Sequence, residues 1–160
     1  MKHDKESEGR MKYIAYGSNM MKDQMAFRCP GARLAGTGHI RGARLEFYLH
    51  ATVEKTGEEA DRVPVAVWEI SEADERSLDL YEGHPDYYIK EEWPVYMDDG
   101  TETVGMIYLM NRIRKMPPRD AYYEGIAEAY RSLGLEEQIG TVLEPALERS
   151  KGREKDDRQG

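Results

Sequence analysis

The stretch Tyr13-Ile14-Ala15-Tyr16-Gly17-Ser18-Asn19-Met20 decides the fold, because an apolar run passes directly into a turn. Its first half has the composition of a short buried strand, and its second half favours a turn followed by a helix start. Gly17 permits backbone dihedrals that other residues avoid, so consecutive N–H groups here could point together at an anion or an oxyanion. Residues 20–29 then indicate a short helix stopped by Pro30-Gly31. We therefore predict an anion-binding turn at the amino end of a helix.

Length and composition bound the class of protein. The chain has 160 residues, of which 39% are hydrophobic and 34% charged, and this suits one globular domain with a substantial core. No apolar run approaches the ~20 residues that a membrane-spanning helix needs. A formal net charge of −8 disfavours a nucleic-acid partner, because binding to phosphates requires a basic surface. The expected partners are small molecules, with no nucleic acid and no membrane.

Residues 11–149 are expected to form this single domain. Residues 1–10 are charged and lack the apolar segment of a secretion signal, so we interpret them as a flexible leader and expect a cytoplasmic protein. The sequence becomes polar and charged from Glu148 onward, which predicts a disordered tail at 150–160. Cys29 is the only cysteine, which excludes an intramolecular disulfide. The histidines are too scattered for a helical zinc site, so no metal is expected.

Much of the remaining chain has the pattern of strands. Residues 32–50 should form two or three of them, and within this range residues 45–50 alternate between apolar and polar side chains, with Glu46 on the polar face. Residues 52–62 have no apolar periodicity and are expected to be a surface loop that could close over a site. Residues 63–70 are rich in β-branched side chains and predict a strand.

The second half of the chain adds a hairpin and two late helices. Residues 87–110 indicate two strands joined at Asp98-Asp99-Gly100, where the Asp-Gly pair is a strong hairpin signal. Residues 119–133 predict a helix, and residues 135–147 predict another that is bent or split by a glycine and a proline. At least five strand-like runs with few helices predict an α+β architecture, with a curved sheet or a small barrel.

A second candidate site lies at the end of a helix between Ser71 and Gly83. Ser71 is a good N-cap, and Asp74 three residues later gives an imperfect capping box. Glu82 follows Leu78 by four residues, so it stands at the edge of the face that should turn toward the core. Burial and the negative end of the helix dipole both raise a carboxyl pKa, which suits a general base. The alternative is an ordinary solvated glutamate.

In their order along the chain, these motifs resemble the gamma-glutamylcyclotransferase-like family. Tyr16-Gly17-Ser18-Asn19-Met20 and Leu78-Asp79-x-x-Glu82-Gly83 carry the resemblance. The supporting matches are Val67-Trp68-Glu69-Ile70, Tyr87-Tyr88, Ile107-Tyr108-Leu109-Met110, Pro117-Pro118 and Tyr123. The resemblance covers about residues 11–134. It implies a small mixed β-barrel flanked by helices, no metal or organic cofactor, and a catalytic Glu82 opposite the Tyr-Gly-Ser-Asn loop.

The activity that the resemblance implies is the cyclisation of a γ-glutamyl amide. The substrate's own α-amino group attacks its γ-carbonyl carbon, giving 5-oxoproline and releasing an amine, so the protein needs no nucleophile. Carried onto this sequence, Glu82 transfers the protons, and N–H groups around Gly17, Ser18 and Asn19 hold substrate oxygens. The further substrate-binding candidates are Tyr13, Tyr16, Tyr88, Tyr108 and Tyr123.

The sequence leaves the donor substrate open. It could be a γ-glutamyl amino acid, a γ-glutamyl amine, the ε-linked glutamyl-lysine left by proteolysis of crosslinks, or a biosynthetic γ-glutamyl protecting group. The connection from Gly83 to Tyr88 is short, and short versions also occur in family members whose substrates are not settled.

Other chemistries fit the sequence less well. Ser18 lacks the G-x-S-x-G nucleophile elbow, and no histidine is placed as its base. Cys29 could be an activated thiol, but a lone cysteine on a short helix is more often a core residue. The rival hypothesis is a non-catalytic protein of the same fold that binds a carboxylate metabolite or serves as a scaffold. Glu82 separates the two, because an acid facing an anion-binding loop would repel such a ligand.

Overall fold

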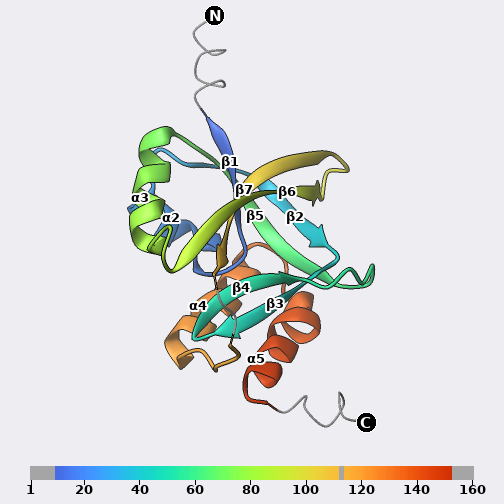
Figure 1. Ribbon diagram of the computed structural model, residues 1–160. Helices are drawn as coiled ribbons and strands as arrows, with labels where there is room; N and C mark the ends of the chain where they lie inside the picture. The colour runs from blue at the N-terminus through green and yellow to red at the C-terminus, as the bar shows by residue number, and fades with distance from the viewer. Residues whose placement is uncertain (1–9, 112–113, 153–160) are drawn as a thin grey trace, which may run out of the picture.

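A closed barrel forms the centre of the computed structural model, which describes residues 10–111 and 114–152 (Figure 1). Around the barrel, the strand order is β1-β5-β2-β6-β7. Their bounds are β1 Met11–Ala15, β2 Arg33–Arg41, β5 Arg62–Ile70, β6 Tyr88–Met97 and β7 Glu102–Met110. β1 and β7 run parallel where Tyr13 pairs with Met106, and the other neighbours are antiparallel. The expected α+β fold with a small mixed barrel is confirmed.

Helices flank the barrel in two groups (Figure 1). α2 (Lys22–Arg28) and α3 (Glu72–Glu82) lie together on one side, whereas α4 (Asp120–Ser132) and α5 (Glu144–Ser150) lie near the other end. Within the part of the chain that the structure describes, no helix is long and apolar enough to cross a membrane.

The cap of α3 is stronger than the sequence suggested. Ser71 Oγ accepts the Asp74 N–H at 3.1 Å, and an Asp74 carboxylate oxygen accepts the Ser71 N–H at 3.1 Å, so the capping box is complete. Gly83 ends the helix in the left-handed conformation, with a φ of 63°, as the sequence predicts. The start and the end of the helix that carries Glu82 are therefore both fixed by local sequence.

A separate hairpin packs beside the barrel and corrects one prediction. β3 (Ala43–Tyr48) pairs with β4 (His50–Lys55) through a turn at Leu49, whose φ is 60°. The surface loop predicted for 52–62 is therefore wrong for 52–55 and holds for 56–61. No alternation is visible in this stretch because consecutive residues of β4 are buried, so both of its faces are covered.

The other strand and helix predictions agree with the structure. The strand at 63–70 is β5, and the hairpin at Asp98-Asp99-Gly100 joins β6 to β7. The helix at 119–133 is α4. The short helix after the first strand is present as a 3₁₀ turn, η1 (Ser18–Met20), followed by α2.

The last helix is longer than the sequence predicted. A π-helical turn, η2 (Ile139–Leu143), contains Gly140 and runs directly into α5, so the expected irregularity is present. However, α5 continues through Ser150, which is buried, so disorder from Glu148 onward is wrong for this part of the chain. The predicted leader residues 1–9 and tail residues 153–160 lie outside the described residues.

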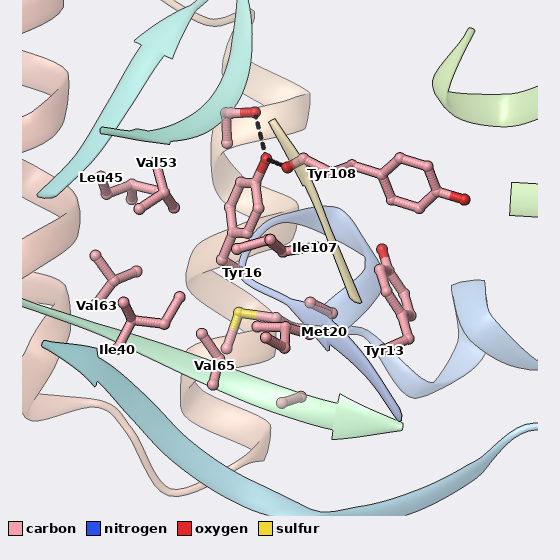
Figure 2. Close-up of a cluster of buried hydrophobic side chains, with 14 of the residues drawn as sticks. Tyr13, Tyr16, Met20, Ile40, Leu45, Val53, Val63, Val65, Ile107 and Tyr108 are labelled. Carbon is pink, nitrogen blue, oxygen red and sulfur yellow. Dashed lines mark hydrogen bonds between the residues drawn. The ribbon is translucent and has the colours of Figure 1, made fainter. Parts of the chain in front are cut away.

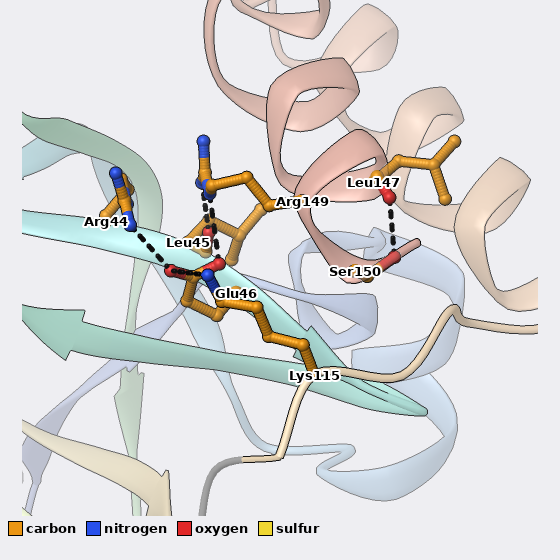
Figure 3. Close-up of polar contacts among 7 residues, drawn as sticks. All are labelled: Arg44, Leu45, Glu46, Lys115, Leu147, Arg149 and Ser150. Atoms are coloured by element: carbon orange, nitrogen blue, oxygen red, sulfur yellow. Dashed lines mark hydrogen bonds and ion pairs between the residues drawn. The ribbon is translucent and has the colours of Figure 1, made fainter. Parts of the chain in front are cut away.

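A buried carboxylate explains why the helix continues. Glu46 on β3 has 0% exposure, so its predicted place on a solvent face is wrong. α5 covers that face of the strand, and Arg149 Nε donates to Glu46 Oε1 at 3.1 Å (Figure 3). Arg44 donates to Glu46 Oε2 at 3.2 Å, and Lys115 Nζ lies 3.9 Å from the same oxygen. We call these four side chains the Glu46 cluster.

Candidate active site

The two motifs singled out from the sequence face one another across a cavity of about 30 Å³. Its lining residues are Tyr13, Tyr16, Gly17, Ser18, Asn19, Ala51, Glu82, Tyr88, Tyr108 and Tyr122. The turn after β1, the end of α3 and the strands β4, β6 and β7 all contribute. Eight of the nine candidate residues from the sequence therefore lie together, and Tyr123 does not.

Glu82 is the acid of this cavity. Burial raises the pKa of its carboxyl to about 7, and the positive charge of Arg28 opposes part of that rise. Within residues 10–111 and 114–152, the Glu82 carboxylate makes no hydrogen bond or ion pair. Its lone pairs are therefore available to a molecule in the cavity, and its pKa suits proton exchange near neutral pH.

The turn opposite Glu82 presents backbone donors. Met20 N–H donates to the Gly17 carbonyl at 3.0 Å, which closes the 3₁₀ turn. The N–H groups of Gly17, Ser18 and Asn19 precede this bond, so they have no acceptor within the turn. This part of the site can therefore receive oxygens that carry negative charge.

Gly17 combines an unusual backbone conformation with a need for space. Its φ is −125° and its ψ is −133°, which is neither helical nor extended and is not the left-handed conformation either. A Cβ atom at this position would lie 3.4 Å from both Ala51 Cβ and Tyr122 Oη. The glycine thus lets the turn pass close to β4 and α4, and a branched side chain would displace them.

The side chain of Asn19 makes its hydrogen bonds within the protein. Its Nδ2 donates to the Tyr13 hydroxyl at 2.8 Å, and its Oδ1 accepts from Arg28. Its carbonyl accepts from Trp68 Nε1 at 3.0 Å. Asn19 therefore shapes the turn, and the backbone N–H is the part of it left for a ligand.

Backbone groups of Ala51 hold three of the tyrosines. Its carbonyl accepts the Tyr88 hydroxyl at 2.7 Å and the Tyr16 hydroxyl at 3.4 Å, and its N–H donates to Tyr122 Oη at 3.0 Å. Tyr16 also donates to the Tyr108 carbonyl (Figure 2). Sequence reasoning missed Ala51, because a residue that acts through its backbone carries no side-chain signal.

Tyr108 connects the cavity to α3. Its hydroxyl donates to Asp79 Oδ1 at 2.6 Å, and Lys90 Nζ pairs with the same carboxylate oxygen at 3.1 Å. Asp79 lies three residues before Glu82 on the helix, so this bond fixes β7 against the part of α3 that carries the acid. Burial above all, followed by the hydrogen bond to Asp79 and the charge of that carboxylate, raises the pKa of the Tyr108 phenol, which stays protonated.

Tyr123 was expected in the cavity, and its neighbour Tyr122 lies there instead. The Tyr123 ring packs against Phe47, with centroids 6.0 Å apart. Adjacent helix positions point about 100° apart, so only one of the two can face Gly17. The i to i+4 spacing does not tell the two apart, because Ile126 and Ala127 are both buried, so the sequence carried no signal that favours Tyr122 over Tyr123.

An outer cleft of about 210 Å³ adjoins the cavity. It shares Ser18, Glu82, Tyr88 and Tyr122 with the cavity, and its other lining residues are Gln24, Arg28, His50, Tyr81 and Tyr87. His50 Nδ1 lies 2.9 Å from the Tyr87 hydroxyl, and the Arg28 guanidinium lies 4.3 Å from the centre of the Tyr81 ring. Glu82 therefore stands where a small inner cavity meets a wider aromatic cleft.

Other reactive groups are less well placed. Cys29 is buried in the core, and burial raises the pKa of its thiol to about 12, the reverse of an activated thiol. A larger groove of about 570 Å³ lies over β1, β6 and β7, but it contains none of the candidate residues. Among the described residues, no group of three or more His, Cys, Asp and Glu side chains is arranged to hold a metal ion.

Comparison with known protein families gives one match that covers most of the chain. The model of the family described as "Gamma-glutamyl cyclotransferase, AIG2-like" matches residues 13–128. The gamma-glutamylcyclotransferases of Bos taurus and Homo sapiens are each 26% identical to this chain over 134 residues, or 77% of the chain and 71% of each relative. The Mus musculus protein of the same name is 26% identical over 142 residues, or 82% of the chain and 76% of its own length.

Solved structures show the same fold. A protein described as "Gamma-glutamyl cyclotransferase" superposes with a TM-score of 0.75 and 24% identity, covering 83% of this chain and 88% of its own. YkqA from Bacillus subtilis superposes with a TM-score of 0.70 and 16% identity, covering 88% of this chain and 56% of its own. At these identities the structures support the barrel architecture alone.

Proposed function

The chain belongs to the gamma-glutamyl cyclotransferase, AIG2-like family, and we propose that it cyclises a γ-glutamyl amide to 5-oxoproline with release of an amine or amino acid. The position of Glu82 carries this proposal. It is an acid with a pKa of about 7 that faces the turn at Gly17 and makes no ion pair or hydrogen bond within the described ranges. The proposal also places the reaction in the cytoplasm.

In this mechanism the reaction is intramolecular, and the protein holds the two reacting atoms of the substrate in position. Attack of the α-amino nitrogen on the γ-carbonyl carbon closes a five-membered ring, and holding the two atoms together can supply up to ~7–11 kcal/mol of the barrier. The inner cavity of about 30 Å³ holds little more than a water molecule. Binding of the glutamyl group therefore requires the lining tyrosines to move apart, and the outer cleft receives the leaving group.

Proton transfer is the task of Glu82. The α-ammonium nitrogen carries three protons in the substrate and one in the lactam, so it loses two, and the leaving nitrogen gains two to depart as an ammonium ion. Glu82 takes each proton from the first nitrogen and returns it to the second, with no net change. A carboxyl with a pKa of about 7 can perform both halves of this cycle at neutral pH.

Charge on the γ-carbonyl oxygen grows as the nitrogen attacks. The N–H groups of Gly17, Ser18 and Asn19 supply donors on the wall opposite Glu82, where they can stabilise that oxygen or the α-carboxylate. Ser18 takes no nucleophilic part in this scheme. Although it shares the outer cleft with His50, no hydrogen bond joins the two side chains in the described part of the chain.

The test is an assay for released amine and for 5-oxoproline over a panel of γ-glutamyl amino acids, γ-glutamyl amines and ε-(γ-glutamyl)lysine. We expect at least one to be turned over, with kcat/KM falling on the acid side at an apparent pKa of about 7. A carboxylate-binding protein would behave in the opposite way, since protonation of Glu82 removes a repulsion. Tighter binding of 5-oxoproline at pH 5 than at pH 8, with no turnover of any panel member, would contradict the proposal.

A further inference from the structure

The residues shared by the inner cavity and the outer cleft mark where the scissile bond must lie. If the glutamyl group occupies the cavity and the leaving group occupies the cleft, the bond between them crosses the boundary. Of the residues that the structure describes, only Ser18, Glu82, Tyr88 and Tyr122 line both spaces. Glu82 therefore lies beside the leaving nitrogen, and the other three residues are placed to reach the γ-carbonyl oxygen. Ser18 belongs to the turn, which contributes backbone N–H groups, so the further side-chain donors to weigh are the two phenols.

The hydrogen bonds show which of the two boundary phenols still has a proton to give. Tyr88 is bonded to the Ala51 carbonyl at 2.7 Å, and a carbonyl can only accept, so the Tyr88 proton is already used. Tyr122 is bonded to the Ala51 N–H at 3.0 Å, and an N–H can only donate, so the phenol oxygen is the acceptor. Within residues 10–111 and 114–152, no acceptor takes the Tyr122 proton.

The hydroxyl proton of Tyr122 lies where a donor to the γ-carbonyl oxygen is needed. A Cβ atom built on Gly17 would lie 3.4 Å from Tyr122 Oη, so the phenol adjoins the turn that offers its backbone N–H groups. Glu82 lies across the cavity. Burial above all, and to a smaller extent the charge of Glu82, raises the pKa of the Tyr122 phenol. The walls are therefore unlike, with a proton acceptor on α3 and proton donors on the turn and on α4.

We propose that Tyr122 is a further catalytic residue, whose hydroxyl donates a hydrogen bond to the γ-carbonyl oxygen as negative charge develops on it. This inference rests on the proposed cyclotransferase activity. No proton is transferred in this step: the O–H bond of Tyr122 stays intact, the C=O electron pair moves onto the oxygen during attack, and it returns when the C–N bond to the leaving amine breaks. The bond to Ala51 aims the phenol while leaving its proton for the substrate.

The experiment compares three isosteric changes, Tyr122→Phe, Tyr88→Phe and Tyr123→Phe, on the best substrate of the panel. Removing one such donor typically lowers kcat by about 10²–10³-fold, and we expect a loss of about 10²-fold for Tyr122→Phe, with KM changed less than about threefold. The acid limb near pH 7 should persist, because Glu82 is intact. Tyr123→Phe, one residue away and outside the cavity, should retain wild-type kcat.

A purely structural role predicts different results. Tyr122→Phe and Tyr88→Phe each remove one bond to Ala51, so equal losses of kcat accompanied by a raised KM would overturn the proposal. So would a lost or displaced acid limb in Tyr122→Phe, since Tyr122 would then act through Glu82. Should the Phe variant melt early, 3-fluorotyrosine at position 122 provides the second measurement. The stronger donor should raise kcat, by about twofold, and an unchanged kcat would contradict the assignment.

The two proposals fail separately. If the wild-type protein turns over no γ-glutamyl compound, the cyclotransferase proposal is wrong and the role of Tyr122 falls with it. If the wild-type protein is active and Tyr122→Phe retains kcat within about threefold, only the role of Tyr122 is wrong.

Discussion

Glu46 and Glu82 are two glutamates drawn away from water in opposite surroundings. Glu46 has 0% exposure, and Arg149, Arg44 and Lys115 point their charges at its two oxygens. Glu82 stands among tyrosine rings, and the one cation that lowers its pKa, Arg28, only partly offsets the effect of burial. One acid has its lone pairs satisfied by the protein, and the other keeps them for a ligand.

If the proposed mechanism holds, the difference separates a structural acid from a catalytic one. A buried carboxylate that is surrounded by cationic donors holds elements together, as Glu46 holds α5 and the segment at Lys115 against β3. A partly buried carboxylate without such donors exchanges protons easily near neutral pH. The same change to glutamine should therefore lower turnover at Glu82 and lower stability at Glu46.

The largest expected effect is on catalysis by Glu82→Gln. The amide keeps the shape of the side chain but cannot accept the proton, so kcat/KM should fall by at least about 10²–10⁴-fold while the melting temperature does not fall. The assay is amine release, with thermal unfolding measured in parallel. Glu72→Gln, at the exposed start of the same helix, is the matched control and should retain activity. Wild-type turnover by Glu82→Gln would remove Glu82 from the mechanism.

Glu46→Gln should instead lower stability and leave chemistry alone. The change removes the negative charge from the Glu46 cluster, in which Glu46 and Arg149 are buried, and we expect the free energy of unfolding to drop by about 3 kcal/mol. Urea unfolding measures this loss. The control is Glu102→Gln, because Glu102 is an exposed residue at the start of β7. The paired change Glu46→Leu with Arg149→Met should recover most of the loss. A stable Glu46→Gln variant that has lost turnover would reverse the comparison.

The turn opposite Glu82 should tolerate loss of a hydroxyl but not gain of bulk. Gly17→Val places branched carbons against Ala51 and Tyr122, so we expect a loss of stability of about 2 kcal/mol and a large loss of turnover. Ser18→Ala should change kcat/KM less than about threefold, because the turn acts through its backbone N–H groups. Steady-state kinetics and thermal unfolding of both variants test this. A Ser18→Ala variant as inactive as Glu82→Gln would point to a hydroxyl nucleophile.

The smallest effect is a pH dependence of stability that Glu82 alone should produce. Its pKa is about 7 in the folded chain against an ordinary value of 4.5, so the folded state binds this proton more tightly. The resulting stabilisation is complete below pH 4.5 and is lost as the pH rises through 7. Relative to Glu82→Gln, the wild-type protein should lose about 2 kcal/mol of unfolding free energy between pH 5 and pH 8. Parallel stability curves for the two proteins would show that the acid is not held in its protonated form.

These two glutamates also show what the sequence can predict. Glu82 could be singled out because the features that place it are local in the sequence: a capped helix, a four-residue spacing to Leu78 and a glycine stop. Glu46 was placed on a solvent face because its cover, α5, lies 103 residues away in the chain. Contacts at that separation leave no periodicity in the strand itself.

The remaining errors have similarly specific causes. β4 was assigned to a loop because a strand covered on both faces shows no alternation. Tyr122 and Tyr123 were exchanged because the helix was placed correctly but its rotation was not, and one position turns a helix by about 100°. The α+β architecture, with a curved sheet or a small barrel, followed from alternation and turn residues, which are short-range signals, whereas the mixed barrel was implied by the resemblance to the family.

Because Ala51 binds the tyrosines through its backbone, the hydrogen bonding inside the cavity depends on the register of β4 against β3. This residue serves Tyr16, Tyr88 and Tyr122 through its N–H and carbonyl, so those bonds do not depend on its side chain, a buried methyl group that lies beside the turn at Gly17. Sliding β4 by a single residue, however, would turn the neighbouring peptide the other way and release Tyr88 and Tyr122 together, whereas Tyr16 would keep its bond to the Tyr108 carbonyl on β7. The tight turn at Leu49 sets that alignment, so the length of a hairpin outside the barrel governs the polarity of the pocket.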